Sequence, residues 1–320
     1  MAFTQYTNLD FEEIKVSLRE YLRANSNFTD FDFEGSNLSI LIDTLAYNTY
    51  VTAYNTNMVA NESFIDSATL RENVVALARN VGYVPSSRRA STANVSFTVD
   101  LGSGTSKSSV TLKAGLVALG DFANTNYTFC VSEDITSPVS DGFAEFTIDI
   151  KQGTFVTNEF VVDTSQPNQK FIIPNPYVDT STLKVQVRDT LTSSSRKTYS
   201  QIDNIVGIST HSETFLIQEI QDEKYELLFG DGVLGKRLSN GNVINSTYIV
   251  TDGVGGNGVS NFSFSGKLVD NDGGLITSGI SGVITNERSS NGAEVESIDT
   301  IRNLSTRVYS AQHRAVTAND

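Results

Sequence analysis

Apolar residues recur at helical spacing near the start of the chain. Four of them are three or four positions apart and share one helix face: Phe11, Ile14, Leu18 and Leu22. Asp10 stands directly before this stripe and Glu13 follows three positions later, which is a carboxylate version of the capping box. The pattern therefore predicts a helix over residues 10–24.

A second helix is predicted from Ser36 through the segment LSILIDTLAYNTYVTAYNTNMVA. Large apolar residues share one face of this helix: Leu38, Leu41 and Leu45. Smaller residues mark another face: Ile42, Ala46, Thr49 and Ala53. Small side chains let a second helix approach closely, so this helix is expected to be contacted from more than one side.

A third helix is predicted from Asp66 or Ser67 to Val81, before the pattern changes. Its apolar stripe is Leu70, Val74, Leu77 and Val81. Gly82 is placed to end the helix and Pro85 prevents a restart. After the linker SSRRAST the apolar period falls from about 3.6 to 2.

Short alternating segments then follow, separated by clusters of Gly, Asn, Asp, Ser and Pro. They are ANVSFTVD, SVTLKAG, NYTFCVS, AEFTIDIK, TFVTNEFVVD, QKFIIP, LKVQVRD, TFLIQEI, KYELLFG and INSTYIV. So many short strands with no helical pattern between them predict antiparallel sandwiches or barrels. Helical spacing returns late in the chain, on Ile298, Ile301, Leu304 and Val308.

The pattern as a whole predicts an α+β fold: a helical module, two antiparallel β-sandwich or barrel-like modules, and a return to helix. The expected divisions are 1–88 for the helices, 89–175 and 176–292 for the β modules, and 293–320 for the final helix. The second boundary follows the Pro174–Asn175–Pro176 stretch, because proline cannot donate to a central ladder. Thr317 or Asn319 has the form of a helix cap, which predicts that the protein continues beyond residue 320.

Composition narrows the classes of function. With 23 Lys and Arg against 37 Asp and Glu, the net charge is −14, which disfavours nucleic acid as a partner. Two histidines and one cysteine are too few for a typical zinc site, which needs about four nitrogen or sulfur ligands. No signal peptide and no membrane-spanning stretch are recognisable. We expect a protein that contacts other proteins and binds no membrane.

Motifs that suggest chemistry have simpler explanations. Gly253–Gly258 matches the dinucleotide pattern G-x-G-x-x-G, but a strand-like segment follows where a helix is required, so a flexible glycine loop is favoured. Asp270–Gly274 suggests a calcium loop without its glutamate, and a turn between strands is favoured. His211 is expected at the surface and Cys130 in a core or interface. No catalytic, cofactor or metal site is predicted.

Three segments resemble the baseplate J-like family, the wedge proteins of contractile-tailed bacteriophages. The stretch ELLFGDGVLGKRLSNGNVINSTYIVTDGVGGNG at residues 226–258 resembles the β-region signature of that family. The segment GAEVESIDTIRNLSTRVYSAQHRAVTAND resembles its passage from the β domain into a C-terminal half. The N-terminal segment FEEIKVSLREYLRANSNFTDFDFEGSNLSILIDTLAYNTY resembles the start of the large wedge subunit.

The resemblance implies a non-enzymatic structural subunit without a cofactor. It would join wedge subunits into the ring around the tail hub and help transmit the trigger for sheath contraction. The implied partners are a second copy of itself, other wedge subunits, and sheath-initiator and tail-hub proteins. The implied location is the virion tail baseplate, after assembly in the cytoplasm of the bacterial host. Family members continue past the Arg-Ala-Val-Thr run that ends at Thr317.

The predicted inter-subunit surface lies on the first two helices. Its residues are Phe11, Ile14, Leu18, Leu38, Leu41 and Leu45. The alternative is that these residues pack only against each other and the third helix. A different alternative for the whole chain is a β-rich phage adhesin or fibre module that binds host surface glycans. That alternative leaves the N-terminal helices unexplained.

Overall fold

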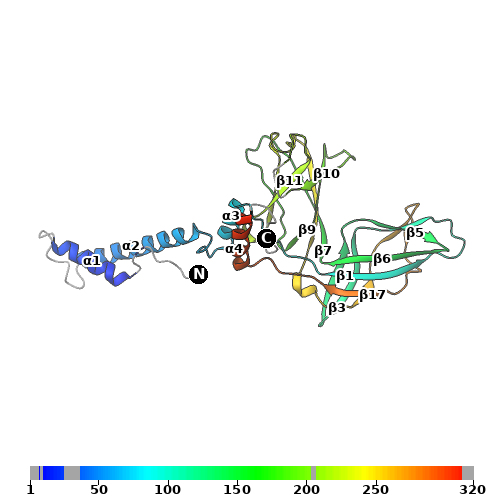
Figure 1. Cartoon of the computed structure of the whole chain (residues 1–320), viewed down its shortest axis with the longest axis horizontal. Coiled ribbons are helices and arrows are strands. Elements are labelled where there is room, and N and C mark those ends of the chain that lie inside the picture. The colour runs from blue at the N-terminus through cyan, green and yellow to red at the C-terminus, as the bar shows by residue number, and fades with distance from the viewer. Residues whose placement is uncertain (1–6, 8–9, 25–36, 203–206, 312–320) are drawn as a thin grey trace. The chain divides into compact units, whose positions relative to one another are not determined.

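The computed structural model describes residues 7, 10–24, 37–202 and 207–311 (Figure 1). The chain divides into two compact units, which are described separately. One unit comprises Met1–Tyr83 with Ser297–Asp320, and the other comprises Val84–Glu296. Helices form the first unit and strands dominate the second, so the predicted α+β class is confirmed.

The helical unit contains α1 (Phe11–Ala24), α2 (Asn37–Glu62), α3 (Arg71–Asn80) and α4 (Ile298–Ala311). The predicted cap of α1 is present. Oδ1 of Asp10 accepts hydrogen bonds from the backbone N–H groups of Glu12 at 2.9 Å and Glu13 at 3.2 Å. These groups have no partner inside the helix, so the carboxylate satisfies donors that would otherwise face solvent.

The third helix begins later than the pattern predicted, at Arg71 instead of Asp66 or Ser67. The cause is Glu62, at the end of α2. Its Oε1 accepts hydrogen bonds from the Thr69 backbone N–H at 2.8 Å and the Thr69 hydroxyl at 2.6 Å. These bonds hold the preceding residues in a turn. Leu70 is therefore the N-cap and is exposed, instead of continuing the buried stripe.

The end of α3 follows the prediction. Gly82 has a φ of 84°, the left-handed region that glycine adopts without strain. The N–H of Gly82 donates to the carbonyl of Arg79 at 2.9 Å, and that of Tyr83 donates to Ala78 at 3.0 Å. This is the Schellman arrangement, which satisfies the last carbonyls of the helix.

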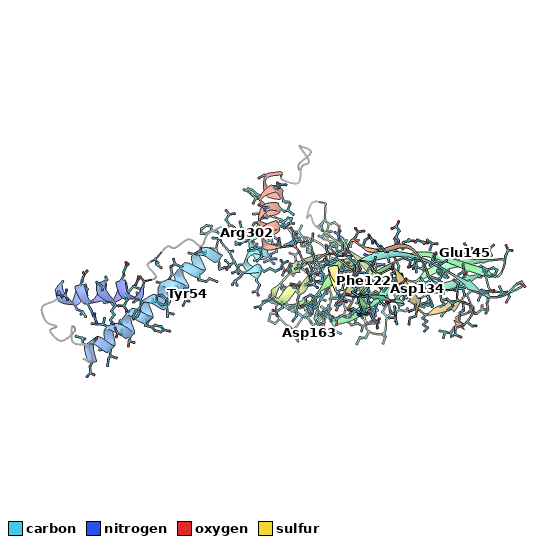
Figure 2. The ribbon with its side chains drawn as sticks, turned by 90° about the horizontal axis from the view of Figure 1, so that it is seen from below. Tyr54, Phe122, Asp134, Glu145, Asp163 and Arg302 are labelled. Atoms are coloured by element: carbon cyan, nitrogen blue, oxygen red, sulfur yellow. The ribbon has the colours of Figure 1, made fainter. Side chains whose placement is uncertain are left out.

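Helix α4 packs on α3, although more than 200 residues separate them in sequence. Ile301 is fully buried in a small core with Ala68, Val74, Val75 and Ala78. Ile298, Leu77 and Tyr83 border this core. Figure 2 labels Arg302, whose Nε donates to the carbonyl of Ile65 at 3.0 Å. The predicted caps at Thr317 and Asn319 lie outside the described residues.

Ten antiparallel strands form the first sheet of the β unit. They are β1 (Thr92–Asp100), β2 (Ser109–Leu112), β3 (Gly115–Phe122), β4 (Thr125–Val131), β5 (Ile135–Ser140), β6 (Phe143–Gln152), β14 (Asn261–Phe264), β15 (Leu268–Asp270), β16 (Leu275–Ile276) and β17 (Ile284–Ser290). The order is β14-β3-β4-β6-β5-β2-β15-β16, and β1 joins β6 to β17. Backbone bonds from Gly258 to Ser289 and from Ser289 to Val259 bring β17 back to the segment before β14, which makes the sheet barrel-like.

Seven strands form the second sheet, in the order β7-β13-β9-β10-β11-β12-β8. They are β7 (Thr154–Val161), β8 (Phe171–Ile172), β9 (Val178–Arg188), β10 (Lys197–Gln201), β11 (Thr214–Glu219), β12 (Tyr225–Phe229) and β13 (Val243–Val250). One pair departs from the antiparallel expectation, because β10 and β11 are parallel. The two edge strands approach each other through Phe160 and Phe171, whose ring centroids are 5.8 Å apart.

Each sheet encloses its own core. Val95, Phe97, Phe129 and Phe146 are among the buried residues of the first. Phe215, Leu227 and Tyr248 are among those of the second. All strands of the second sheet lie between β6 and β14 in the sequence, so the chain leaves the first sheet near Gly153 and returns after Val250.

Candidate functional site: the apolar surface of the N-terminal helices

Helix α1 packs along one side of α2, as Figure 1 shows. The buried residues in the first half of α2 are Ser39, Ile42 and Ala46. Ile42 and Ala46 belong to the face whose small residues were predicted to admit a close helix. An ion pair of 2.5 Å between Lys15 Nζ and Asp43 Oδ1 also joins the two helices.

The second half of α2 is contacted by Thr7, which precedes α1. Asn57 is completely buried and fixes this contact. Its Oδ1 accepts the backbone N–H of Thr7 at 3.0 Å, and its Nδ2 donates to the Thr7 hydroxyl at 2.8 Å. The Thr7 hydroxyl donates in turn to the carbonyl of Ala53 at 3.2 Å. The same side of α2 is thus covered along its whole length, by α1 in the first half and by Thr7 in the second.

The six residues of the predicted inter-subunit surface fall into two groups. Phe11, Ile14, Leu18 and Leu38 are half-buried. Leu41 and Leu45 are exposed, at 57% and 55%. The role of these six residues as an inter-subunit surface remains a prediction.

The sequence analysis missed a second exposed stripe on α2. It consists of Ile40, Tyr47, Val51 and Tyr54. These residues are seven, four and three positions apart, which is again helical spacing. With about 100° of rotation per residue, this stripe and the Leu41/Leu45 stripe lie roughly 110° to either side of the buried face. Figure 2 labels Tyr54, half of whose surface is exposed.

Helix α2 is therefore apolar on three sides and covered on one. A helix with this pattern is normally buried on several sides by its neighbours. Exposed threonine hydroxyls of α2 donate to carbonyls one turn earlier, Thr44 to Ile40 at 2.9 Å and Thr49 to Leu45 at 2.9 Å, so these hydroxyls are satisfied within the helix.

The third helix does not supply the missing cover in the described part of the chain. Val74 and Leu77 pack with Ile301 and Ile298 of α4 instead. None of the six predicted surface residues belongs to that core, as far as the described residues show. The residues that the structure describes thus leave the two stripes of α2 exposed.

The glycine-rich segment is packed, which corrects the expectation of a flexible loop. Gly253–Gly256 forms a short 3₁₀ turn in which Gly253 and Gly256 are buried. The hydroxyls of Ser91 and Ser289 donate to the carbonyl of Gly256, at 2.9 Å and 2.7 Å. A Cβ on Gly256 would be 2.6 Å from Oγ of Ser91, so only glycine fits. These glycines allow the segment to pack closely against the first sheet. The sequence had already disfavoured a dinucleotide-binding site here.

Gln152 fixes the same junction from inside the protein. Its side-chain Oε1 accepts the Thr251 hydroxyl at 2.6 Å and the Asp252 N–H at 3.0 Å, while Nε2 donates to Asp252 Oδ2 at 2.7 Å. Gln152 is 1% exposed, so these bonds are shielded from water. The two chain crossings between the sheets are bonded to each other through this side chain.

The remaining candidates for chemistry take structural positions. His211 is exposed, with Nδ1 2.9 Å from the Thr210 hydroxyl. Asp270–Gly274 is a turn between β15 and β16, and Lys107 Nζ contacts Asp270 at 2.9 Å and Asp272 at 2.6 Å. The described residues contain no group of three or more His, Cys, Asp or Glu side chains suited to hold a metal ion.

Cys130 lies in a small core with Ala90, Ile249 and Phe155, which confirms the prediction of a buried residue. Burial raises the pKa of its thiol to about 12, although Lys151 opposes the shift. Such a thiol is protonated at neutral pH and is a poor nucleophile. Among the helices that the structure describes, none is long and apolar enough to cross a membrane.

Comparisons with known proteins relate the helical region to phage baseplates. Residues 10–83 match a family model described as the helical domain of baseplate wedge protein gp6-like. The chain is also 30% identical to the baseplate wedge protein gp6 of Enterobacteria phage T4, over 97% of this chain and 48% of that protein. The chain thus spans about half the length of this curated relative.

Among solved structures, the chain is similar to one from the cryo-EM structure of the baseplate of the anti-feeding prophage (AFP), 6-fold symmetrised. The identity is 14% and the TM-score is 0.32, with 96% of this chain and 54% of that chain covered.

Proposed function

We propose that the chain is a structural subunit of the baseplate wedge of a contractile-tailed phage. The observation that carries this proposal is the partly covered helix α2, which lies inside the segment that matches the wedge helical domain. The sequence identity to a baseplate wedge protein extends over nearly the whole chain and supports the same role. The protein acts by assembly, and its work requires no catalytic group.

The two units divide this role. Helix α1 and Thr7 hold α2 from one side, so that its other sides present Leu41, Leu45, Tyr47 and Tyr54 in fixed positions. Helices of neighbouring subunits cover these stripes and form a bundle. The two packed sheets of the β unit serve as rigid spacers between the attachment points.

The partners follow from the resemblance to the baseplate J-like family and from the wedge relatives. They are a second copy of the chain, other wedge subunits, and sheath-initiator and tail-hub proteins. The assembled chain belongs to the ring around the tail hub and helps transmit the signal for sheath contraction. Its location is the virion tail baseplate, and assembly takes place in the cytoplasm of the bacterial host.

The test is co-expression with the neighbouring tail genes, followed by affinity purification of the full chain. Leu41→Asp combined with Leu45→Asp places two carboxylates on one exposed stripe. We expect the partner subunits to be lost from the purified complex, because burying unpaired charges in an apolar bundle is strongly unfavourable. The circular dichroism of the chain alone should stay unchanged, since both positions face solvent in the single chain.

The matched control is Thr192→Asp combined with Ser194→Asp. It adds the same two charges to exposed polar positions of the β unit, between β9 and β10. This variant should purify with the partners like the unmodified chain. If instead the Leu41/Leu45 variant assembles normally, α2 is not the inter-subunit surface. If both variants fail, charge alone explains the loss and the proposal also fails.

A further inference from the structure

Two segments lead from the β unit into the helical unit, and they pair with each other. Residues 86–90 precede β1 and residues 292–296 follow β17; we call them together the neck. Arg89 and Ala293 exchange two backbone hydrogen bonds, of 3.0 Å and 3.1 Å, in an antiparallel bridge. Because both segments continue into the helical unit, any load that the helices pass along the chain reaches the β unit through the neck.

The second sheet is bonded to the first of these segments. The backbone N–H of Ala90 donates to Oδ2 of Asp179, near the start of β9, at 2.9 Å. Asp179 is 1% exposed, so this bond is shielded from water. The backbone N–H of Thr180 donates to Oγ of Ser87 at 2.9 Å, and the two hydroxyls are 2.8 Å apart. The position of the second sheet therefore depends on where the neck lies.

Arg88 joins the two neck segments to the second sheet. One of its terminal nitrogens forms an ion pair of 2.8 Å with Glu294 Oε2, in the other neck segment. Its guanidinium carbon lies 4.2 Å from the ring centroid of Tyr177, which directly precedes β9. The carboxylate and the negative face of the ring attract the same cation. Glu294 thus helps to hold the guanidinium over Tyr177.

Tyr177 has a backbone conformation that is unfavourable for a bulky side chain. Its φ is 62°, in the left-handed region that residues other than glycine adopt at an energetic cost. Its carbonyl accepts the Thr251 N–H at 3.0 Å, and the nearby Asn175 Oδ1 accepts the Tyr248 hydroxyl at 2.7 Å. Nε of Arg88 is buried without a hydrogen-bond partner among the described residues, which is a further cost. Such costs persist only where surrounding contacts impose them, and they are typical of switch regions.

Outside the neck, the described contacts between the two sheets are concentrated at the chain crossings. They include a small apolar cluster around Cys130 and the hydrogen bonds of Gln152. An ion pair of 2.8 Å between Glu133 and Lys184 is exposed and contributes little. Domains that share a small interface move relative to one another unless a further contact prevents it. The crossings thus form a pivot, and the bonds from β9 to the neck are the contact that holds the second sheet on it.

We propose that Arg88 is a latch that couples the pairing of the neck to the position of the second sheet. When the neck segments separate, Arg88 loses Glu294 and leaves the ring of Tyr177. Tyr177 then returns to the extended region, the bonds from β9 to the neck weaken, and the second sheet turns on the first about the chain crossings. All these contacts lie within one chain, so the latch does not depend on the proposed assembly role.

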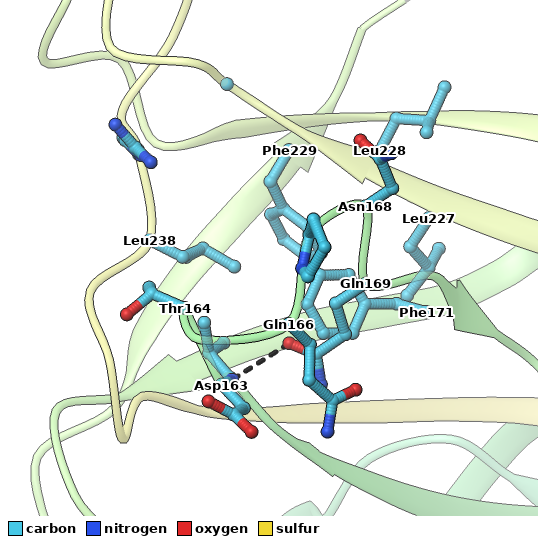
Figure 3. A pocket seen from close by; sticks show the side chains of 14 residues that line it. Asp163, Thr164, Gln166, Asn168, Gln169, Phe171, Leu227, Leu228, Phe229 and Leu238 are labelled. Carbon is cyan, nitrogen blue, oxygen red and sulfur yellow. Dashed lines mark hydrogen bonds between the residues drawn. The ribbon is translucent and has the colours of Figure 1, made fainter.

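The displacement should be largest in the loop after β7, which Figure 3 shows. Strand β7 begins at the crossing and has 8 residues, so its far end lies roughly 25 Å away. Spin labels at Gln166→Cys in this loop and at Glu145→Cys in β6 therefore report the turn as a distance in the full chain; Figure 3 labels Gln166 and Figure 2 labels Glu145. Both positions are exposed, whereas Cys130 is buried and does not take the label.

We expect one narrow distance distribution for the chain that carries the labels alone. Arg88→Met keeps the length of the side chain but removes its charge, and it should add a second population at a different distance. Tyr177→Gly removes both the ring and the cost of the positive φ, and it should have the same effect. Glu294→Gln changes only the neck side of the latch and should shift part of the molecules in the same way.

Two variants are matched controls. Tyr177→Phe keeps the ring under Arg88, and Arg288→Met removes the same charge from an exposed position of β17. Both should give the distribution of the labelled chain without further changes. An unchanged distribution in Arg88→Met, in Tyr177→Gly or in Glu294→Gln would overturn the latch, and so would a second population in either control. Circular dichroism checks that each variant keeps its strands; if Arg88→Met does not fold, Tyr177→Gly and Glu294→Gln decide.

Discussion

The strand β1 and the helix α2 bury their apolar residues to very different extents. In β1, Ala93, Val95, Phe97 and Val99 alternate with half-buried polar residues and are all buried. In α2, Ile42 and Ala46 are buried, whereas larger residues on the other sides are exposed. The apolar face of β1 is thus covered within the chain, whereas the described residues leave the outer sides of α2 exposed. Apolar residues in a sequence predict burial, but the partner that buries them can belong to another molecule.

The largest expected difference between the two regions concerns single truncations to alanine. Phe146 is 2% exposed, and its ring is stacked on Phe97 at 4.9 Å. Phe146→Ala should lower the free energy of unfolding of the chain by about 3–5 kcal/mol, because it leaves a cavity. Leu41→Ala should change it by about 0.5 kcal/mol or less, because Leu41 faces solvent. Urea denaturation followed by circular dichroism measures both.

In the assembled complex Leu41→Ala should become disruptive, whereas the effect of Phe146→Ala should stay the same. Leu41→Ala should weaken copurification with partner subunits while leaving the single chain stable. If Leu41→Ala lowered the free energy of unfolding of the single chain by several kcal/mol, α2 would be covered within the chain. The contrast between β1 and α2 would then disappear.

A smaller effect is expected at the glycines, which test how tightly the β unit is packed outside its strands. Gly256→Ala forces a Cβ to within 2.6 Å of Ser91 Oγ and 2.7 Å of Gln152 Cγ. We expect a loss of about 1–3 kcal/mol from this overpacking. Gly282→Ala meets no atom within 4 Å and is the control. Thermal unfolding should separate the two variants; equal midpoints would mean that the glycine-rich segment is loose after all.

The smallest effect at neutral pH concerns Cys130, and it appears only in alkali. Burial raises the pKa of this thiol from its ordinary value of 9.0 to about 12. Unfolding above pH 9 therefore releases a proton, so the stability of the β unit should fall as the pH rises from about 9 to about 12. Below pH 9 the thiol is protonated in both states and contributes no pH dependence.

Denaturation of the chain at a series of pH values checks this expectation. Cys130→Ala should make the alkaline decline shallower. It should not abolish the decline, because burial also raises the pKa of Tyr248 to about 12. An unchanged slope in the variant would show that the thiol is already accessible in the folded chain.

Local features of the fold could be predicted where the cause is local. The carboxylate of Asp10 and the positive φ of Gly82 act within one turn of a helix, and both ends followed the prediction. The period of two located strands such as β1, β6 and β13 for the same reason, whereas β5, β10 and β17 lie outside the predicted segments. The start of α3 could not be predicted, because it depends on Glu62, which reaches it from the preceding helix.

The pairing of the strands could not be predicted from local sequence features. Nothing in the alternation of β10 and β11 distinguishes a parallel from an antiparallel neighbour. The contact between Phe160 and Phe171 closes the second sheet through side chains and leaves no periodic signal. The glycine-rich segment has the composition of a flexible loop, and only the positions of Ser91 and Gln152 make it a packed one.

The candidate surface was only partly predictable for a related reason. Helical spacing identified Leu41 and Leu45, and the same rule applied to Tyr47 and Tyr54 would have found the second stripe. Spacing could not show which face α1 covers, because Ile42 and Ala46 recur with the same helical period as Leu41 and Leu45 and differ from them in burial.

The two chain crossings at Gly153 and Val250 lie against each other, since a side chain on Gly153 would collide with the Val250 backbone. Everything between them belongs to the second sheet, and no strand of the first sheet is interrupted. Recombination at this point could therefore exchange one β domain for another of any length without disturbing the pairing of the first sheet. Residues 154–250 could therefore be replaced as one unit while the ten strands of the first sheet keep their pairing.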